Sequence, residues 1–143
     1  MADSGNHTIR KVTSDGVVTT LAGTPGAAGS TNGSGGAARF NHPAGIAVVP
    51  SGGLMVSDTD NHSIRKVTAA GDVTSIGGLD GTNGDADGTG TAARFDKPSA
   101  LTINGAGTVF VIDTNNCRVS KSTSTLIIVW RTPASASTKS PRT

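Results

Sequence analysis

The stretch SDTDNHSIRKV, from Ser57 to Val67, nearly duplicates the phrase ADSGNHTIRKV that begins at Ala2. A third version, IDTNNCRVSKS, begins at Ile112 and keeps the Asp and the Asn at corresponding places. Successive versions are separated by a constant 55 residues. A fixed period of this length indicates a structural unit that cannot bury its faces alone and therefore stacks on copies of itself.

A second phrase recurs in phase with the first. AARFNHP is followed 55 residues later by AARFDKP. Because two separate phrases recur at the same spacing, a chance match is a poor explanation. The spacing also gives the length of the unit. The residues that we assign to the start of a unit are Arg39, Phe40 and Pro43, and then Arg94, Phe95 and Pro98.

The texture of one unit is that of β-structure. Short runs rich in Val and Ile alternate with Gly, Pro, Asn and Asp, and no helical period lasts more than a turn. The predicted strands of the complete unit are Ala44–Val49, Leu54–Ser57, Ser63–Thr68 and Asp72–Ile76. The turns between them are short enough for antiparallel hairpins, and Gly-rich connections at 24–38 and 79–93 join one meander to the next. We therefore expect an all-β fold, a partial β-propeller of four-stranded antiparallel blades.

The two phrases also point to a known family. DTDNHSIRKV and ARFNHPAGIAV resemble the signature phrases of NHL-repeat proteins, and the resemblance covers roughly residues 1–123. It implies the fold of that family, a propeller that is usually six-bladed. Six units would need about 330 residues, whereas this chain holds about 2.6 units. We interpret the chain as a partial array, a fragment of a longer propeller.

The repeat divides the chain into segments. These are a partial blade at 1–23, a connection and a complete blade at 24–78, a connection and a divergent third blade at 79–130, and a disordered tail at 131–143. An open stack of blades exposes an apolar sheet face at each end. Self-association through these open faces is therefore a further expectation.

The repeated turn is interpreted as a structural device. An Asp carboxylate and an Asn amide can bond to the backbone of a tight connection, and Asn tolerates the left-handed conformation. Ile9, Ile64 and Val119 are expected to supply apolar side chains between blades. Every unit reuses these residues, whereas a catalytic site is normally built once. The turn residues are Asp3, Asn6 and His7, then Asp58, Asn61 and His62, then Asp113 and Asn116.

Two features resemble metal sites, and each fails a chemical test. His7 and His62 have Cys117 as their third counterpart, but equivalent positions in successive blades lie too far apart for ligands at about 2.0–2.3 Å. The segment NGDADG at 83–88 begins like a calcium loop, yet its twelfth position is Arg94 instead of a carboxylate. We expect neither a metal nor another cofactor.

Composition narrows the classes of partner. The formal charge is only +2, and three Phe, one Trp and no Tyr leave few rings to stack on bases, which argues against a nucleic-acid partner. The repeated bases Arg10 and Arg65 are expected to meet Asp3 and Asp58. No window approaches the length of a membrane span, and the N-terminus lacks the pattern of a signal peptide. We expect a soluble chain with no membrane contact.

The chemistry of the chain predicts binding and no catalysis. No nucleophile elbow, phosphate-binding loop or acid–base pair stands outside the repeat. The predicted function is a non-catalytic binding or scaffold module whose protein or peptide partner meets the loops at one end of the propeller. Two alternatives stay open because the resemblance implies both. One is a metal-dependent lyase or hydrolase with its active residues in blades outside this chain, and the other is an RNA-binding propeller.

Overall fold

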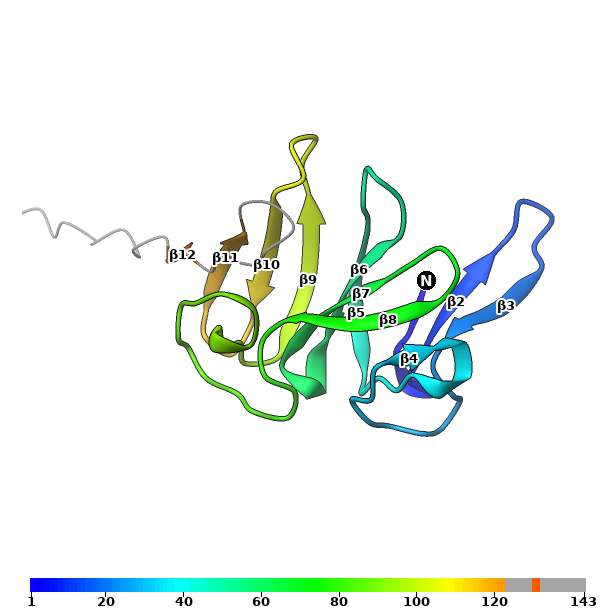
Figure 1. The fold of residues 1–143 in the computed structure, drawn as a ribbon, viewed down its shortest axis with the longest axis horizontal. Coiled ribbons are helices and arrows are strands. Elements are labelled where there is room, and N and C mark those ends of the chain that lie inside the picture. The colour runs from blue at the N-terminus through cyan, green and yellow to red at the C-terminus, as the bar shows by residue number, and fades with distance from the viewer. Residues whose placement is uncertain (123–129, 132–143) are drawn as a thin grey trace, which may run out of the picture.

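The computed structural model describes residues 1–122 and 130–131, which form three antiparallel sheets that fan out side by side in chain order (Figure 1). The first sheet contains β1 (Ala2–Asp3), β2 (Thr8–Val12) and β3 (Val18–Ala22). The second contains β5 (Pro43–Val48), β6 (Leu54–Asp58), β7 (Ser63–Val67), β8 (Asp72–Gly77) and β4 (Gly33–Ser34). The third contains β9 (Pro98–Ile103), β10 (Val109–Asp113), β11 (Arg118–Ser122) and β12 (Trp130–Arg131).

The helical turns are all short. Four 3-10 turns interrupt the strands, and the described residues contain no α-helix. They are η1 (Ser4–Asn6), η2 (Gly35–Ala37), η3 (Thr59–Asn61) and η4 (Gly90–Ala92). The fold is therefore all-β, as predicted, and no helix in the described ranges is long and apolar enough to cross a membrane.

The second sheet differs from the prediction at its outer edge. The four expected strands form with ends shifted by a residue or so, but the connection at 24–38 also supplies a strand. Gly33 and Ser34 pair with Val73 and Asp72, so β4 lies beyond β8. The prediction that this connection is only a Gly-rich loop was wrong, because a strand so short carries no hydrophobic pattern of its own.

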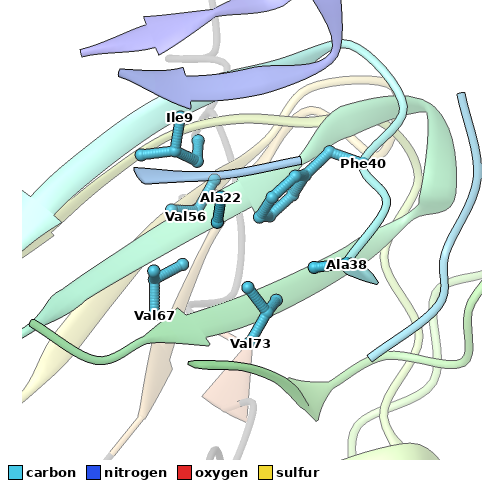
Figure 2. Packing of buried hydrophobic residues seen from close by; sticks show 7 residues of the cluster. All are labelled: Ile9, Ala22, Ala38, Phe40, Val56, Val67 and Val73. Carbon is cyan, nitrogen blue, oxygen red and sulfur yellow. The ribbon is translucent and has the colours of Figure 1, made fainter. Parts of the chain in front are cut away.

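Neighbouring sheets share one kind of joint. We call the side of a sheet that faces the next sheet its forward face, and the opposite side its backward face. At the first joint, Ile9 and Ala22 on the forward face of the first sheet pack with buried residues of the second unit (Figure 2). These residues are Ala38, Phe40, Val56, Val67 and Val73.

The second joint repeats this packing one unit further along the chain. Ile64 lies on the forward face of the second sheet and packs with Phe95, Val109 and Val111 of the third unit. Ile9, Ile64 and both Phe side chains have an exposed fraction of 0%. Val119, the third predicted interblade residue, is 41% exposed. The prediction that it packs between blades is not met in the described residues, where no sheet follows the third.

The division at 1–23, 24–78, 79–130 and 131–143 stays a prediction about units, although each sheet falls almost entirely within one segment. Arg131 lies in β12 and pairs with Ser120, so the first residue of the predicted tail belongs to a strand. The remainder of the tail, at 132–143, lies outside the described residues.

Candidate functional site

The turn between β6 and β7 is built around one buried carboxylate. Asp58 Oδ1 accepts a hydrogen bond from the Asn41 backbone N–H at 2.7 Å, and its Oδ2 accepts one from Asn61 Nδ2 at 2.8 Å. Asn61 Nδ2 also donates to the Gly29 carbonyl at 2.7 Å. The Asp and Asn therefore join their turn to the connection that precedes the same sheet.

The third unit repeats this geometry closely. Asp113 accepts from the Asp96 N–H at 2.7 Å and from Asn116 Nδ2 at 2.8 Å. Asn116 Nδ2 also donates to the carbonyl of Gly84 at 2.7 Å. In the first unit the Asn6 amide contacts both oxygens of Asp3 at 3.1 Å. A structural role for these residues stays a prediction, which the repeated bonds support.

The left-handed residue of each turn is not the Asn. His7, His62 and Cys117 follow the Asn residues and have φ values of 58°, 56° and 51°. Each donates its backbone N–H back to a carbonyl three residues earlier and closes the short turn. The prediction that Asn is the left-handed residue of the turn was wrong, because the Asn side chain is used for hydrogen bonding and the residue after it is left-handed.

Arg65 fills the space behind the second turn. Its side chain and that of Asp58 are both 0% exposed, and their Nη1–Oδ2 distance is 2.8 Å. The guanidinium also donates to the Arg39 and Thr31 carbonyls and to Asn32 Oδ1. It lies 5.4 Å from the centre of the Phe40 ring, which adds a cation–π contact. The expected Arg–Asp pairing is present here, and Arg10 meets Asp3 at 3.3 Å in the first unit.

Burial has the largest effect on the pKa of the Asp58 carboxyl. Removal from water raises the pKa of Asp58 to about 6, although the Asn41 N–H, Asn61 and Arg65 all act to lower it. Burial also raises the pKa of Asp113, against the hydrogen bonds from Asn116 and the Asp96 N–H. Both shifts have the same direction because both groups hold the same place in the repeat.

The residues at the start of each unit fill defined places. Arg39 Nη1 donates to the carbonyls of Gly36 and Ala38, and Arg94 Nη1 donates to those of Thr91 and Ala93. Phe40 and Phe95 enter the two joints, and Pro43 and Pro98 begin β5 and β9. Each group closes a 3-10 turn and places a ring between sheets.

The imidazoles of the two turn histidines accept hydrogen bonds from the backbone of the next unit. His7 Nδ1 accepts the His42 N–H at 3.1 Å, and His62 Nδ1 accepts the Lys97 N–H at 3.1 Å. His42 and Lys97 are themselves left-handed, with φ of 48° and 51°. Each turn histidine thus holds the strained start of the next unit. Within residues 1–122 and 130–131, no three His, Cys, Asp or Glu side chains gather to hold a metal ion.

Exposed charges gather where β5 and β9 begin and where η3 joins β6 to β7. His42 Nδ1 lies 2.8 Å from Asp60 Oδ2, and Lys97 Nζ lies 3.1 Å from Asp60 Oδ1. The side chains of His42 and Lys97 are 51% and 50% exposed. We call these three residues the charged end. Partial burial pushes the pKa of Asp60 upward, but Lys97 and then His42 hold it below its usual range.

The charged end was not predicted from the sequence. His42 and Lys97 hold equivalent places in successive units, but Asp60 has Gly5 and Asn115 as its counterparts. A position that changes among otherwise similar units is the signal that could have found it.

A groove lies at the opposite end of the first joint. Its volume is about 600 Å³, and it is bordered mainly by apolar residues such as Val12, Ile46, Val48 and Leu54, together with Arg10 and Lys11. A smaller hollow of about 290 Å³ occupies the corresponding place at the second joint, beside Met55 and Val109. No carboxylate side chain is among the described residues that line either hollow.

Part of the second unit matches a known sequence repeat. The family model described as NHL repeat matches residues 40–67, which run from Phe40 through β7. The human NHL repeat-containing protein 3 is 31% identical over 113 residues, which is 79% of this chain and 30% of that protein. The chain belongs to the NHL-repeat family. The chloroplastic protein SUPPRESSOR OF QUENCHING 1 of Arabidopsis thaliana is 33% identical over 89 residues, covering 62% of this chain and 8% of that protein.

Solved structures agree with this assignment of the NHL fold. An auxiliary nutrient binding protein from Bacteroides thetaiotaomicron superposes with a TM-score of 0.71 at 25% identity, over 82% of this chain and 32% of that chain. The NHL chain thus spans about a third or less of the proteins it matches. Its fold is that of β-propeller blades.

Proposed function

We propose that these NHL repeats form a non-catalytic binding module and that a protein or peptide partner contacts the charged end. The observation that carries the proposal is the contrast between repeated and unrepeated positions. The residues that hold each turn recur, and Asp58, Asn61 and Asp113 among them are buried. The position of Asp60, in contrast, has a different residue in each unit, and Asp60 pairs with two half-exposed basic groups. Residues that bind a partner are free to differ where residues that hold a repeat together are not.

The chemistry of the charged end fits a polypeptide. Lys97 and His42 offer donors, Asp60 offers a carboxylate, and Asn115 and Asp96 lie beside them, joined by a 3.2 Å hydrogen bond. Mixed signs of charge suit a peptide carrying both signs, because each charge can meet an opposite one. A binding role is also consistent with the similarity to the auxiliary nutrient binding protein of Bacteroides thetaiotaomicron.

A displayed library of random peptides tests the proposal. Peptides are selected on the wild-type chain and then measured against the triple variant H42A, D60A and K97A. We expect dissociation constants to rise at least about tenfold, since each tenfold corresponds to about 1.4 kcal/mol. Lys11→Ala is the matched control, because Lys11 is exposed and lies by the groove at the other end. Failure to select any peptide, or equal binding to the triple variant, would refute the proposal.

A further inference from the structure

The two basic residues of the charged end both have an unfavourable backbone conformation. His42 and Lys97 have φ values of 48° and 51°, which residues other than Gly rarely adopt. They also precede Pro43 and Pro98, and a proline ring favours extended backbone in the residue before it. A left-handed residue at such a place persists only where its surroundings hold it there.

A histidine of the preceding unit holds each of these two positions. His62 Nδ1 accepts a hydrogen bond from the Lys97 N–H at 3.1 Å, and His7 Nδ1 accepts one from the His42 N–H at 3.1 Å. A ring nitrogen accepts a hydrogen bond only while it carries no proton itself. Both bonds therefore require a neutral imidazole, and the conformation of the charged end depends on that neutral state.

Asp96 offers the protonated ring of His62 a different partner. Its Oδ1 lies 3.4 Å from His62 Nδ1, and both side chains are largely buried. A protonated Nδ1 is a donor, so it can bond to this carboxylate but can no longer accept the Lys97 N–H. At the other position the rings of His7 and His42 meet edge-on, with their centres 4.6 Å apart, so two protonated rings there would repel each other.

We propose that protonation of His62 releases the backbone of Lys97 and thereby weakens binding at the charged end in acid. The proposal rests on the function proposed above and makes His62 a positioning residue. The charged groups around it are Asp96, at the start of the next unit, and Lys97 with its partner Asp60 from η3, 3.1 Å away. Once Lys97 leaves the left-handed conformation, its ammonium group no longer meets Asp60. Histidine takes up its proton between about pH 8 and about pH 5, so the change falls within this range.

NMR of the isotope-labelled full chain tests the release without any partner. The Lys97 amide proton is expected to shift upfield between about pH 8 and about pH 5, along the same curve as the ring protons of His62. H62N is the matched variant, because Asn Oδ1 lies as many bonds from the backbone as His Nδ1, accepts at every pH in this range and tolerates the left-handed φ of 56°. Its Lys97 amide is expected not to follow pH. A wild-type Lys97 amide that ignores the titration of His62 would overturn the proposal.

Peptide affinity tests the consequence for binding. A peptide selected on the charged end is expected to bind the wild-type chain roughly tenfold more weakly at about pH 5.5 than at about pH 7.5, because one hydrogen bond is lost. H62N is expected to lose most of this difference, and H62A, which has no acceptor, to bind weakly at both values. An equal pH dependence in wild type and H62N would overturn the proposal, since it would come from His42 or Asp58, which both chains retain. If no peptide can be selected, the proposed function fails, and the Lys97 amide still decides whether His62 controls that backbone.

Discussion

The turn between β6 and β7 and the turn between β10 and β11 have nearly the same hydrogen bonds, but the groups behind them differ. Arg65 fills the space behind Asp58, whereas the counterpart of Arg65 in the third unit is Ser120. Ser120 is 1% exposed, and its hydroxyl has no hydrogen-bond partner among the residues that the structure describes. The Asp–Asn pair is therefore common to the two turns, whereas the buried guanidinium belongs to the second unit alone of these two.

The third unit nevertheless keeps an arginine on the same strand face. Arg118 lies two residues before Ser120, and it donates to the carbonyl and the carboxylate of Asp85 at 3.1 and 3.3 Å. Residues two apart on a strand point to the same side. In the third unit the basic residue therefore stands two positions earlier in the strand. It contacts the Gly-rich connection and is more exposed than Arg65. The lesson is that the repeat tolerates a change in which residue carries the base.

Arg65→Ala is expected to have the largest effect. It leaves Asp58 buried without its guanidinium, and breaking a buried pair by removing one partner costs about 3–5 kcal/mol. Urea unfolding followed by circular dichroism measures the loss. A loss below about 1 kcal/mol would show that Asn41 and Asn61 alone satisfy the carboxylate, as their counterparts do in the third unit.

The pH dependence of stability is expected to be the next largest effect. Because the folded pKa of Asp58 is raised to about 6 above its usual value of 3.8, folding takes up a proton between these values. The free energy of unfolding should therefore fall as pH rises from about 4 to about 6, by about 1–3 kcal/mol. Asp113 contributes in the same direction. Urea unfolding across this range checks the slope, and Asp58→Asn should flatten it. An unchanged slope in that variant would contradict the assignment.

Ser120→Arg would make the third unit more like the second. A guanidinium at this buried position should approach Asp113 and stabilise its charged form, lowering the pKa of that carboxyl. We expect a gain of at most about 1 kcal/mol, because desolvation of the new charge opposes the pairing. Carbon-detected NMR titration of Asp113 reports the pKa. An unchanged pKa would mean that the new side chain points elsewhere.

Arg118→Ala is expected to have the smallest effect. Its partner Asp85 is 61% exposed, and ion pairs of this kind contribute less than about 1 kcal/mol. Thermal unfolding of this variant beside Arg65→Ala gives the comparison directly. Equal losses of stability in the two variants would show that Arg118 stabilises the fold as much as the buried Arg65 does.

Much of the fold, and the residues of the turns, can be predicted from the sequence repeat. The 55-residue spacing predicts the sheets, and Asp58 and Asn61 are identified as turn residues because they recur. The Phe40 phrase likewise predicts where a unit starts, and Phe40 lies in a joint. These features are local or periodic, so a single sequence contains them.

Other features depend on partners far along the chain. Strand β4 forms because Gly33 and Ser34 meet β8, roughly forty residues later, and nothing in Gly-Ser favours a strand. His62 reaches the Lys97 N–H across a joint, and Asp60 meets Lys97 in the same way. Val119 is apolar like its counterparts Ile9 and Ile64, but it is buried only where another sheet packs against it. Periodicity alone cannot predict whether such a sheet is present.

The joint between sheets also bears on how such arrays lengthen. A segment copied from 24 to 78 would bring Phe40 to fit the sheet before it and Ile64 to receive the sheet after it. It would also bring β4, which covers its own outer edge. Duplication of this one stretch of gene would thus insert a blade whose two contact faces already match its new neighbours. Gain or loss of whole blades is therefore an accessible evolutionary step for such a repeat.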